Sequence, residues 1–222
     1  MIELKYKCWE DITVNVFEKL NDAINNVEYS GNNELDTLNQ QVAILTVLCD
    51  VDEDVIAELN TVEFSELVRQ TDFLNETPKK NLVDKITLNG KKYEIFLSIR
   101  EMTMSQYIDF QTYFPHKDKK FKEILSIFIL PKGKRYGEGY KIEDVINDIG
   151  EYLPITDANN IMFFFALAYQ SLTKVILTSL IKEMKKLRKK EKNKERVEQI
   201  EQAIMKIQEA QSSVKDGGGF IM

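Results

Sequence analysis

The chain begins with a segment in which two kinds of side chain alternate. Residues 2–9 alternate between apolar and polar or charged positions, and a period of two predicts a strand with one buried face. Residues 16–27 instead carry apolar side chains at every third or fourth position, which predicts an amphipathic helix capped by Asp11 or Thr13. The same reasoning predicts three more helices, of which the first is deeply buried, over residues 38–49, 53–59 and 61–74.

A turn signal marks the middle of the chain. Two strand-like runs between residues 85 and 99 flank Asn89-Gly90, and both members of this pair tolerate a positive φ. We therefore predict a β-hairpin over residues 85–99. Downstream, the apolar pattern predicts a helix over 101–110, an apolar segment over 121–130, a glycine-bearing loop over 131–140 and a helix near 142–149.

Three short segments recur in the same order in the two halves of this region. One match of this kind arises easily by chance, whereas three in a single order favour an internal duplication. The matched pairs are residues 13–20 with 103–110, 44–48 with 124–128, and 53–56 with 143–146.

The last third of the chain has a different pattern. Residues 161–181 contain a single charged side chain, Lys174, and are long enough to cross a bilayer. Their polar residues gather along one side, which favours a helix buried in the protein or against a partner over a membrane span. Residues 182–211 continue the helical pattern as one helix with a short coiled-coil-like seam, formed by Val197, Ile200, Ile204 and Ile207.

Together these patterns predict an α+β fold that is predominantly helical. Two related halves, each a strand followed by helices, precede a long C-terminal helix, and the second half opens with the hairpin. The expected boundaries are residues 1–77 and 84–160 for the halves, 161–211 for an apolar and then basic helix, and 212–222 for a flexible glycine tail.

Charge is distributed unevenly along the chain. The formal net charge is −6, but residues 1–181 carry 19 basic and 29 acidic side chains, whereas residues 182–196 carry 9 basic and 3 acidic ones. One segment is therefore cationic and the body acidic, which bears on binding partners rather than on the fold. The N-terminal alternation also lacks the unbroken apolar core of a secretory signal, so we expect the protein to stay where it is made.

The residues that catalysis or metal binding needs are scarce. The single histidine, His116, excludes a two-histidine metal site, and it is interpreted as an exposed loop residue rather than as a member of a catalytic triad. Cys8 and Cys49 are far apart in sequence and are interpreted as buried small hydrophobic residues. The loop over 131–140 contains neither of the two phosphate-binding motifs, GxxxxGK[ST] and GxGxxG. The carboxylates of residues 50–54 fit the start of a helix better than a calcium-binding loop. We therefore expect a non-enzymatic protein without a metal, cofactor or small-molecule substrate.

Two groups of residues in the C-terminal third are candidates for binding. The aromatic run is a candidate surface for a protein partner. The basic run faces either solvent, a nucleic acid or an acidic protein surface, because so many charged side chains cannot pack into the protein's own core. The candidates for the protein partner are Phe163, Phe164, Phe165 and Tyr169, and those for a polyanion are Lys185, Lys186, Arg188, Lys189, Lys190 and Lys192.

One stretch of the first half resembles a known family. Residues 45–59, followed by 62–67, resemble phage tail assembly chaperones, which carry an apolar helix ending in Leu-Thr-Gly-Leu, an acidic helix start and a further short helix; here Val47 replaces the glycine. The hairpin and the helix that follows Thr103 are similar to the opening of the same family. Residues 163–187 are similar in style to structural-region proteins of phages of gut Bacteroides, including the crAss-like group.

The resemblance implies a function in virus assembly. It covers residues 1 to about 160 and implies a protein that shields the apolar surface of an unassembled tail or virion component in the host cytoplasm. Its expected partners are other phage structural proteins, with a second copy of the chain as a further candidate and no membrane. If the virus is short-tailed, the alternative is a minor virion or packaged cargo protein whose basic helix contacts DNA weakly and without sequence preference, or contacts an acidic virion surface. The basic helix and the glycine tail lie outside the chaperone pattern.

Overall fold

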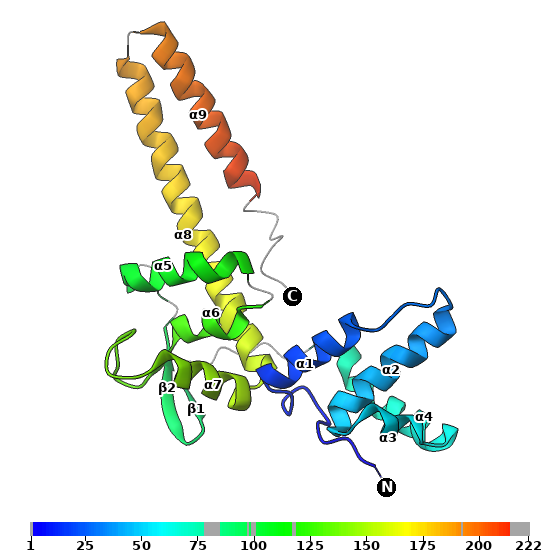
Figure 1. The fold of residues 1–222 in the computed structure, drawn as a ribbon. Helices are drawn as coiled ribbons and strands as arrows, with labels where there is room; N and C mark the ends of the chain where they lie inside the picture. Colours follow the sequence, from blue (N-terminus) through cyan, green and yellow to red (C-terminus); the bar gives the residue numbers. More distant parts are fainter. Residues whose placement is uncertain are drawn as a thin grey trace. The chain divides into compact units, whose positions relative to one another are not determined.

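The computed structural model describes residues 2–77, 85–96, 98, 101–116, 119–191 and 193–213. The chain divides into two units, one formed by Met1–Phe96 with Ser105–Asn160 and the other by Leu97–Met104 with Ile161–Met222. The predicted halves 1–77 and 84–160 thus belong to one unit, apart from Leu97–Met104 of the second half, which belongs to the other. The predicted α+β fold, predominantly helical with a small sheet and a long C-terminal helix, is confirmed (Figure 1).

The first half of the larger unit is helical. Asn32 begins the second helix, because its side chain accepts hydrogen bonds from the amides of Glu34 and Leu35. Asn60 begins the fourth through a capping box with Glu63. The helices are α1 (Val14–Asn25), α2 (Asn33–Cys49), α3 (Glu53–Ala57) and α4 (Thr61–Gln70), followed by the 3₁₀ helix η1 (Thr71–Asn75).

The strand predicted over residues 2–9 is wrong. The described residues 2–9 form no strand, although Leu4 is buried as the alternation predicts. The amides of this segment instead reach the end of α2, where the Leu48 carbonyl accepts hydrogen bonds from Lys5 N (2.9 Å) and Tyr6 N (3.3 Å). A helix C-terminus offers unpaired carbonyls of this kind, so the segment satisfies its backbone without a sheet.

The predicted hairpin is confirmed. Strands β1 (Lys85–Leu88) and β2 (Lys91–Ile95) pair antiparallel across Asn89 and Gly90, whose φ values are +50° and +71°. A third strand, β3 (Ile129–Pro131), pairs with β2 and was not predicted. It continues directly from α6 (Phe121–Phe128), and periodicity cannot divide so continuous an apolar run into helix and strand.

The two halves pack together into a single core. In the second half α5 (Met104–Tyr113) leads through η3 (Phe114–His116) to α6, and α7 (Ile142–Tyr152) packs against both α6 and α1. The Thr13 segment forms a bridge with Pro154, and Lys122 Nζ lies 2.7 Å from Glu18 Oε2. Fully buried side chains from both halves form the core, including Leu45, Leu48, Ile124, Phe128 and Ile149.

The matched segments of the predicted repeat occupy helices in both halves. Leu20 and Phe110 are both buried, and so are Leu48 and Phe128. The third pair differs, because Ile56 is buried whereas its counterpart Ile146 is half-buried. In the first pair, too, Val14 is buried whereas its counterpart Met104 is 72% exposed, so burial agrees only at some positions and the duplication stays a prediction.

The C-terminal third forms two helices where one was predicted. Helix α8 (Ile155–Lys190) ends at a short break, and α9 (Lys194–Ser213) runs back beside it (Figure 1). Asn193 ends the continuity, because its side chain accepts hydrogen bonds from Glu195 N (3.0 Å) and Arg196 N (3.4 Å) and so starts a new helix. The predicted tail over 212–222 lies largely outside the described residues.

Candidate partner-binding surfaces

The aromatic run predicted to bind a partner contributes to the protein's own packing. Phe165 is fully buried, and Phe163 and Phe164 are half-buried and meet edge to face with ring centroids 5.6 Å apart. The side chain of Tyr169 lies outside the described side chains. The binding of a partner by this run stays a prediction. Within the described part of the chain, no helix is both long and apolar enough to span a bilayer.

The seam between α8 and α9 joins apolar and charged side chains. Ile181 of α8 and Ile204 of α9 are both buried, and Arg188 Nη1 lies 3.1 Å from Glu201 Oε1 across the two helices. Val197, Ile200 and Ile207, which the sequence placed on a seam, are half-buried. The α8/α9 hairpin is thus held by an apolar seam with an ion pair near its closed end.

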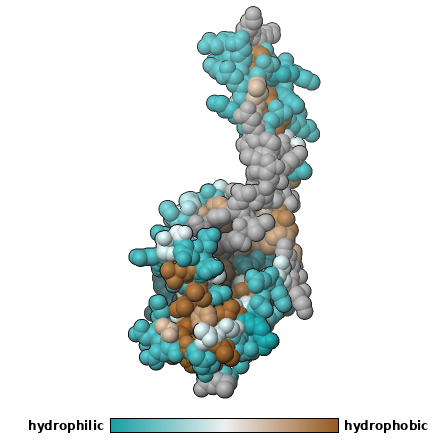
Figure 2. Space-filling model, turned by 90° about the vertical axis from the view of Figure 1, so that its right-hand side faces the viewer, coloured by the Kyte–Doolittle hydropathy of each residue, from teal (hydrophilic) through white to brown (hydrophobic). Residues whose placement is uncertain are grey.

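One face of α8, beside this seam, carries five lysines. Helical rotation of about 100° per residue places them within one third of the helix circumference, together with Thr178. They line two adjoining open hollows, of about 380 and 390 Å³, which share Thr178 and Lys182. Figure 2 shows this end of the molecule covered mainly by hydrophilic side chains. We call this surface the lysine face; it consists of Lys174, Lys182, Lys185, Lys186 and Lys189.

The lysine face differs from the basic set that the sequence suggested. Lys185, Lys186 and Lys189 belong to it, whereas Arg188 points to the seam and Lys190 is exposed beside it. Lys192 lies outside the described residues. Sequence reasoning missed Lys174 and Lys182, because it grouped residues by closeness in sequence. Placing the same residues on a helical wheel would have found both.

Two helices of the larger unit expose apolar side chains. On α2, Leu35 and Leu38 are 45% and 47% exposed, although they begin the stripe that leads to the buried Leu45. The sequence predicted Leu38 to be buried, but the core covers only the C-terminal half of α2. On α5, Tyr107 and Ile108 are 45% and 56% exposed, although Phe110 on the same helix is buried. Figure 2 shows hydrophobic side chains reaching the surface of this body.

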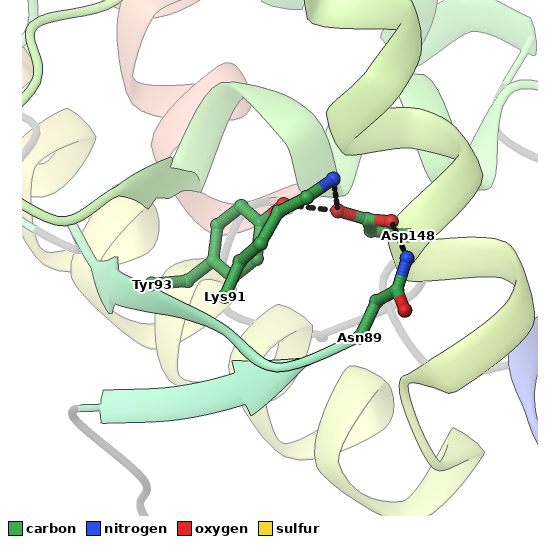
Figure 3. A network of polar contacts seen from close by, with 4 residues as sticks. All are labelled: Asn89, Lys91, Tyr93 and Asp148. Atoms are coloured by element: carbon green, nitrogen blue, oxygen red, sulfur yellow. Dashed lines mark hydrogen bonds and ion pairs between the residues drawn. The ribbon is translucent and has the colours of Figure 1, made fainter.

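A polar network fixes the β-hairpin to α7 (Figure 3). The carboxylate of Asp148, of which 7% is exposed, accepts hydrogen bonds from Asn89 Nδ2 (3.3 Å), Lys91 Nζ (2.7 Å) and the Tyr93 hydroxyl. Burial would raise the pKa of Asp148, but these three donors outweigh it and hold the pKa below its ordinary value. Burial and the neighbouring carboxylate raise the pKa of Tyr93. The buried carboxylate and the buried Tyr93 hydroxyl thus have hydrogen-bond partners, which is typical of a structural network.

Removing the Asp148 carboxylate should destabilise the larger unit. Asp148→Ala leaves the buried Tyr93 hydroxyl without its acceptor, and an unsatisfied buried group costs about 1–3 kcal/mol. We expect the free energy of unfolding at neutral pH to fall by that amount in urea titrations. Glu151→Gln, an exposed change on the same helix, should alter it by less than about 0.5 kcal/mol. Equal effects of the two changes would contradict a stabilising network.

The same network should contribute to acid sensitivity. Because the pKa of Asp148 is lower in the folded chain than the unfolded value of about 3.9, its contribution is complete above that value. It is lost as pH falls through the folded pKa, so the stability difference between the native protein and Asp148→Ala should shrink below about pH 4. A difference that persists unchanged at lower pH would contradict this assignment.

The structure brings together no set of metal ligands in the described ranges. No group of three or more histidine, cysteine, aspartate or glutamate side chains there could hold a metal ion. The loop before α7 is ordered by protein contacts, because the Tyr136 hydroxyl donates to Asp109 Oδ2 (2.8 Å) and the Gly137 amide donates to the Tyr140 hydroxyl (3.2 Å). Comparisons with protein-family models, with curated proteins and with solved structures find no match to this chain.

Proposed function

We propose that this chain is a non-enzymatic bacteriophage assembly protein that binds another virion component through apolar side chains of its helices. The observation that supports this most directly is the exposure of Leu35 and Leu38 on α2 and of Tyr107 and Ile108 on α5. Both helices lie in the part of the chain that resembles tail assembly chaperones. An assembly chaperone needs such side chains, because it must cover an apolar surface on its partner until polymerisation buries it.

The proposed binding relies on burial of apolar surface. Each such side chain, when fully buried, contributes about 1.5–3 kcal/mol. Part of this gain is offset by the loss of rotational freedom on association, so binding through a few half-exposed side chains is reversible. Reversible binding suits a protein that releases its partner during assembly. No chemical step is required, which fits the absence of a catalytic constellation in the sequence.

Site-specific photo-crosslinking in infected cells tests this proposal. A photoreactive phenylalanine analogue at Leu38 or Ile108 should form an adduct with a phage structural protein. The control places the same analogue at Glu151, which is exposed on α7 and polar, and should give little adduct. Adducts of equal yield at all three positions, or none with any phage structural protein, would contradict the proposal.

A second candidate function is that of a minor virion or packaged cargo protein. The observation that favours it is the lysine face, which an assembly chaperone does not need. In this function the basic helix contacts DNA, or an acidic virion surface, inside the particle. The two candidates differ in copy number, because cargo remains in the mature particle whereas a chaperone leaves it.

A further inference from the structure

We propose that the lysine face of α8 binds the phosphate backbone of double-stranded DNA without regard to base sequence. The inference rests on the second candidate function for its partner class and names the surface and the mode of contact. It assigns the contact to Lys174, Lys182, Lys185, Lys186 and Lys189 rather than to the whole basic run.

The length of the lysine face matches the charge density of DNA. Lys174 and Lys189 are fifteen residues apart on a continuous helix, which corresponds to about 22 Å at 1.5 Å per residue. Duplex DNA carries one negative charge per about 1.7 Å of its axis, so a stretch of this length offers about 13 phosphates. All five ammonium groups can therefore approach phosphates of one short stretch of duplex. An acidic protein surface would need carboxylates spread over the same length.

The lysines of this face are available for a partner. In the part of the chain that the structure describes, none of the five takes part in an ion pair, whereas Arg188 pairs with Glu201 and Arg196 lies 4.0 Å from Glu191. Arg188 is thus paired across the seam, whereas the five lysines are exposed. The hydroxyl group of Ser179 lies among them, and hydroxyl groups commonly contact phosphate oxygens. The Thr178 hydroxyl donates a hydrogen bond to the Lys174 carbonyl (2.7 Å).

The kind of basic residue predicts binding without sequence preference. Arginine reads guanine through two parallel hydrogen bonds, whereas lysine on a flexible stem acts as a point charge toward phosphate. The arginines of this region are held in ion pairs, and the face contains lysines with small hydroxyl and apolar residues. Such a surface contacts the backbone and reads no base edges.

Fluorescence anisotropy with a labelled 20-base-pair duplex tests the proposal, using the full chain. If five phosphates are neutralised, the logarithm of the association constant should fall with the logarithm of salt with a slope of about −4.5. This corresponds to a loss of about 500-fold between 50 and 200 mM salt. Two duplexes of unrelated sequence should bind equally.

Matched lysine substitutions distinguish the contribution of the lysine face to binding from the contribution of total charge. Replacing Lys182, Lys185, Lys186 and Lys189 by glutamine should reduce the slope to about −0.9 and weaken binding at 50 mM salt by at least tenfold. The control replaces four exposed lysines elsewhere and removes the same charge with little expected effect. Glutamine has nearly the helix propensity of lysine, and circular dichroism verifies that both variants fold. The control positions are Lys92, Lys119, Lys141 and Lys206.

The outcomes distinguish this inference from the assembly proposal. Equal losses in the two variants would overturn it, because binding would then depend on net charge alone. No binding of the native protein to the duplex at 50 mM salt would also overturn it and leave the face to an acidic protein surface. Neither result affects the crosslinking test, which probes α2 and α5.

Discussion

Replacing Phe128 by alanine should lower the free energy of unfolding of the larger unit by about 3–5 kcal/mol, the usual cost of removing a buried phenylalanine ring. Phe128 is fully buried at the junction of α6 and β3, with its ring centroid 6.0 Å from that of Phe110. Its carbonyl accepts a hydrogen bond from Phe96 N (2.7 Å), so the ring is fixed where the helix meets the sheet. A loss of this size is a large part of the roughly 5–15 kcal/mol by which a native domain is usually stable.

Urea denaturation with circular dichroism measures this effect. The matched control is Tyr107→Ala, which removes a large side chain from the exposed side of α5 and should change the free energy of unfolding by no more than about 0.5 kcal/mol. If Phe128→Ala proved as stable as the control, the placement of α6 and β3 in the core would be wrong.

Replacing Ile204 by aspartate should detach α9 from α8. Ile204 is buried against the seam, and loss of a buried isoleucine side chain alone costs about 2–5 kcal/mol before the penalty for a buried charge. Most of the stability of a helix in a protein comes from the packing of its apolar face, so α9 should lose much of its stability when it loses α8. We therefore expect amide hydrogen exchange throughout α9 to accelerate by at least about 30-fold, the equivalent of 2 kcal/mol.

The neighbouring residue provides the control for the hairpin. Met205 is 61% exposed, so Met205→Asp introduces the same charge in the same turn of α9 without burying it. Exchange in α9 should then stay within about threefold of the native rate. Equal acceleration in both variants would mean that helix propensity, and not the seam, determines the stability of α9.

Local signals in the sequence predicted local structure well. Asn89-Gly90 specified the hairpin, because its backbone preferences act within four residues and need no partner elsewhere. The apolar stripes likewise located most helices. The predictions for residues 2–9 and for β3 were wrong for the opposite reason. The structure of each segment depends on the distant backbone groups to which it is hydrogen-bonded. The Leu48 carbonyl accepts hydrogen bonds from two amides of residues 2–9, and β3 pairs with β2.

The candidate surfaces were predicted in part. The sequence identified a basic helix, but it could not know that the chain reverses at Asn193 and that the returning helix engages Arg188 through Glu201. That reversal determines which basic side chains remain on a free face. Of the aromatic run, Phe165 is buried and its two neighbours are half-buried, and the binding of a partner by this run stays a prediction. The Asp148 network was not predicted, because Asp148 is distant in sequence from its three donors in the hairpin and none of the four residues is unusual by itself.

The central proposal, that this chain acts in the assembly of virus particles, is tested most directly by quantitative mass spectrometry of fractions from infected cells. Assembly intermediates and mature particles are purified separately, and the copies of this chain per copy of the main structural protein are counted in each. We predict enrichment in intermediates and near absence from mature particles. Many copies in mature particles would favour the cargo function, and a chain found in neither fraction, free in the lysate throughout infection, would contradict a function in assembly.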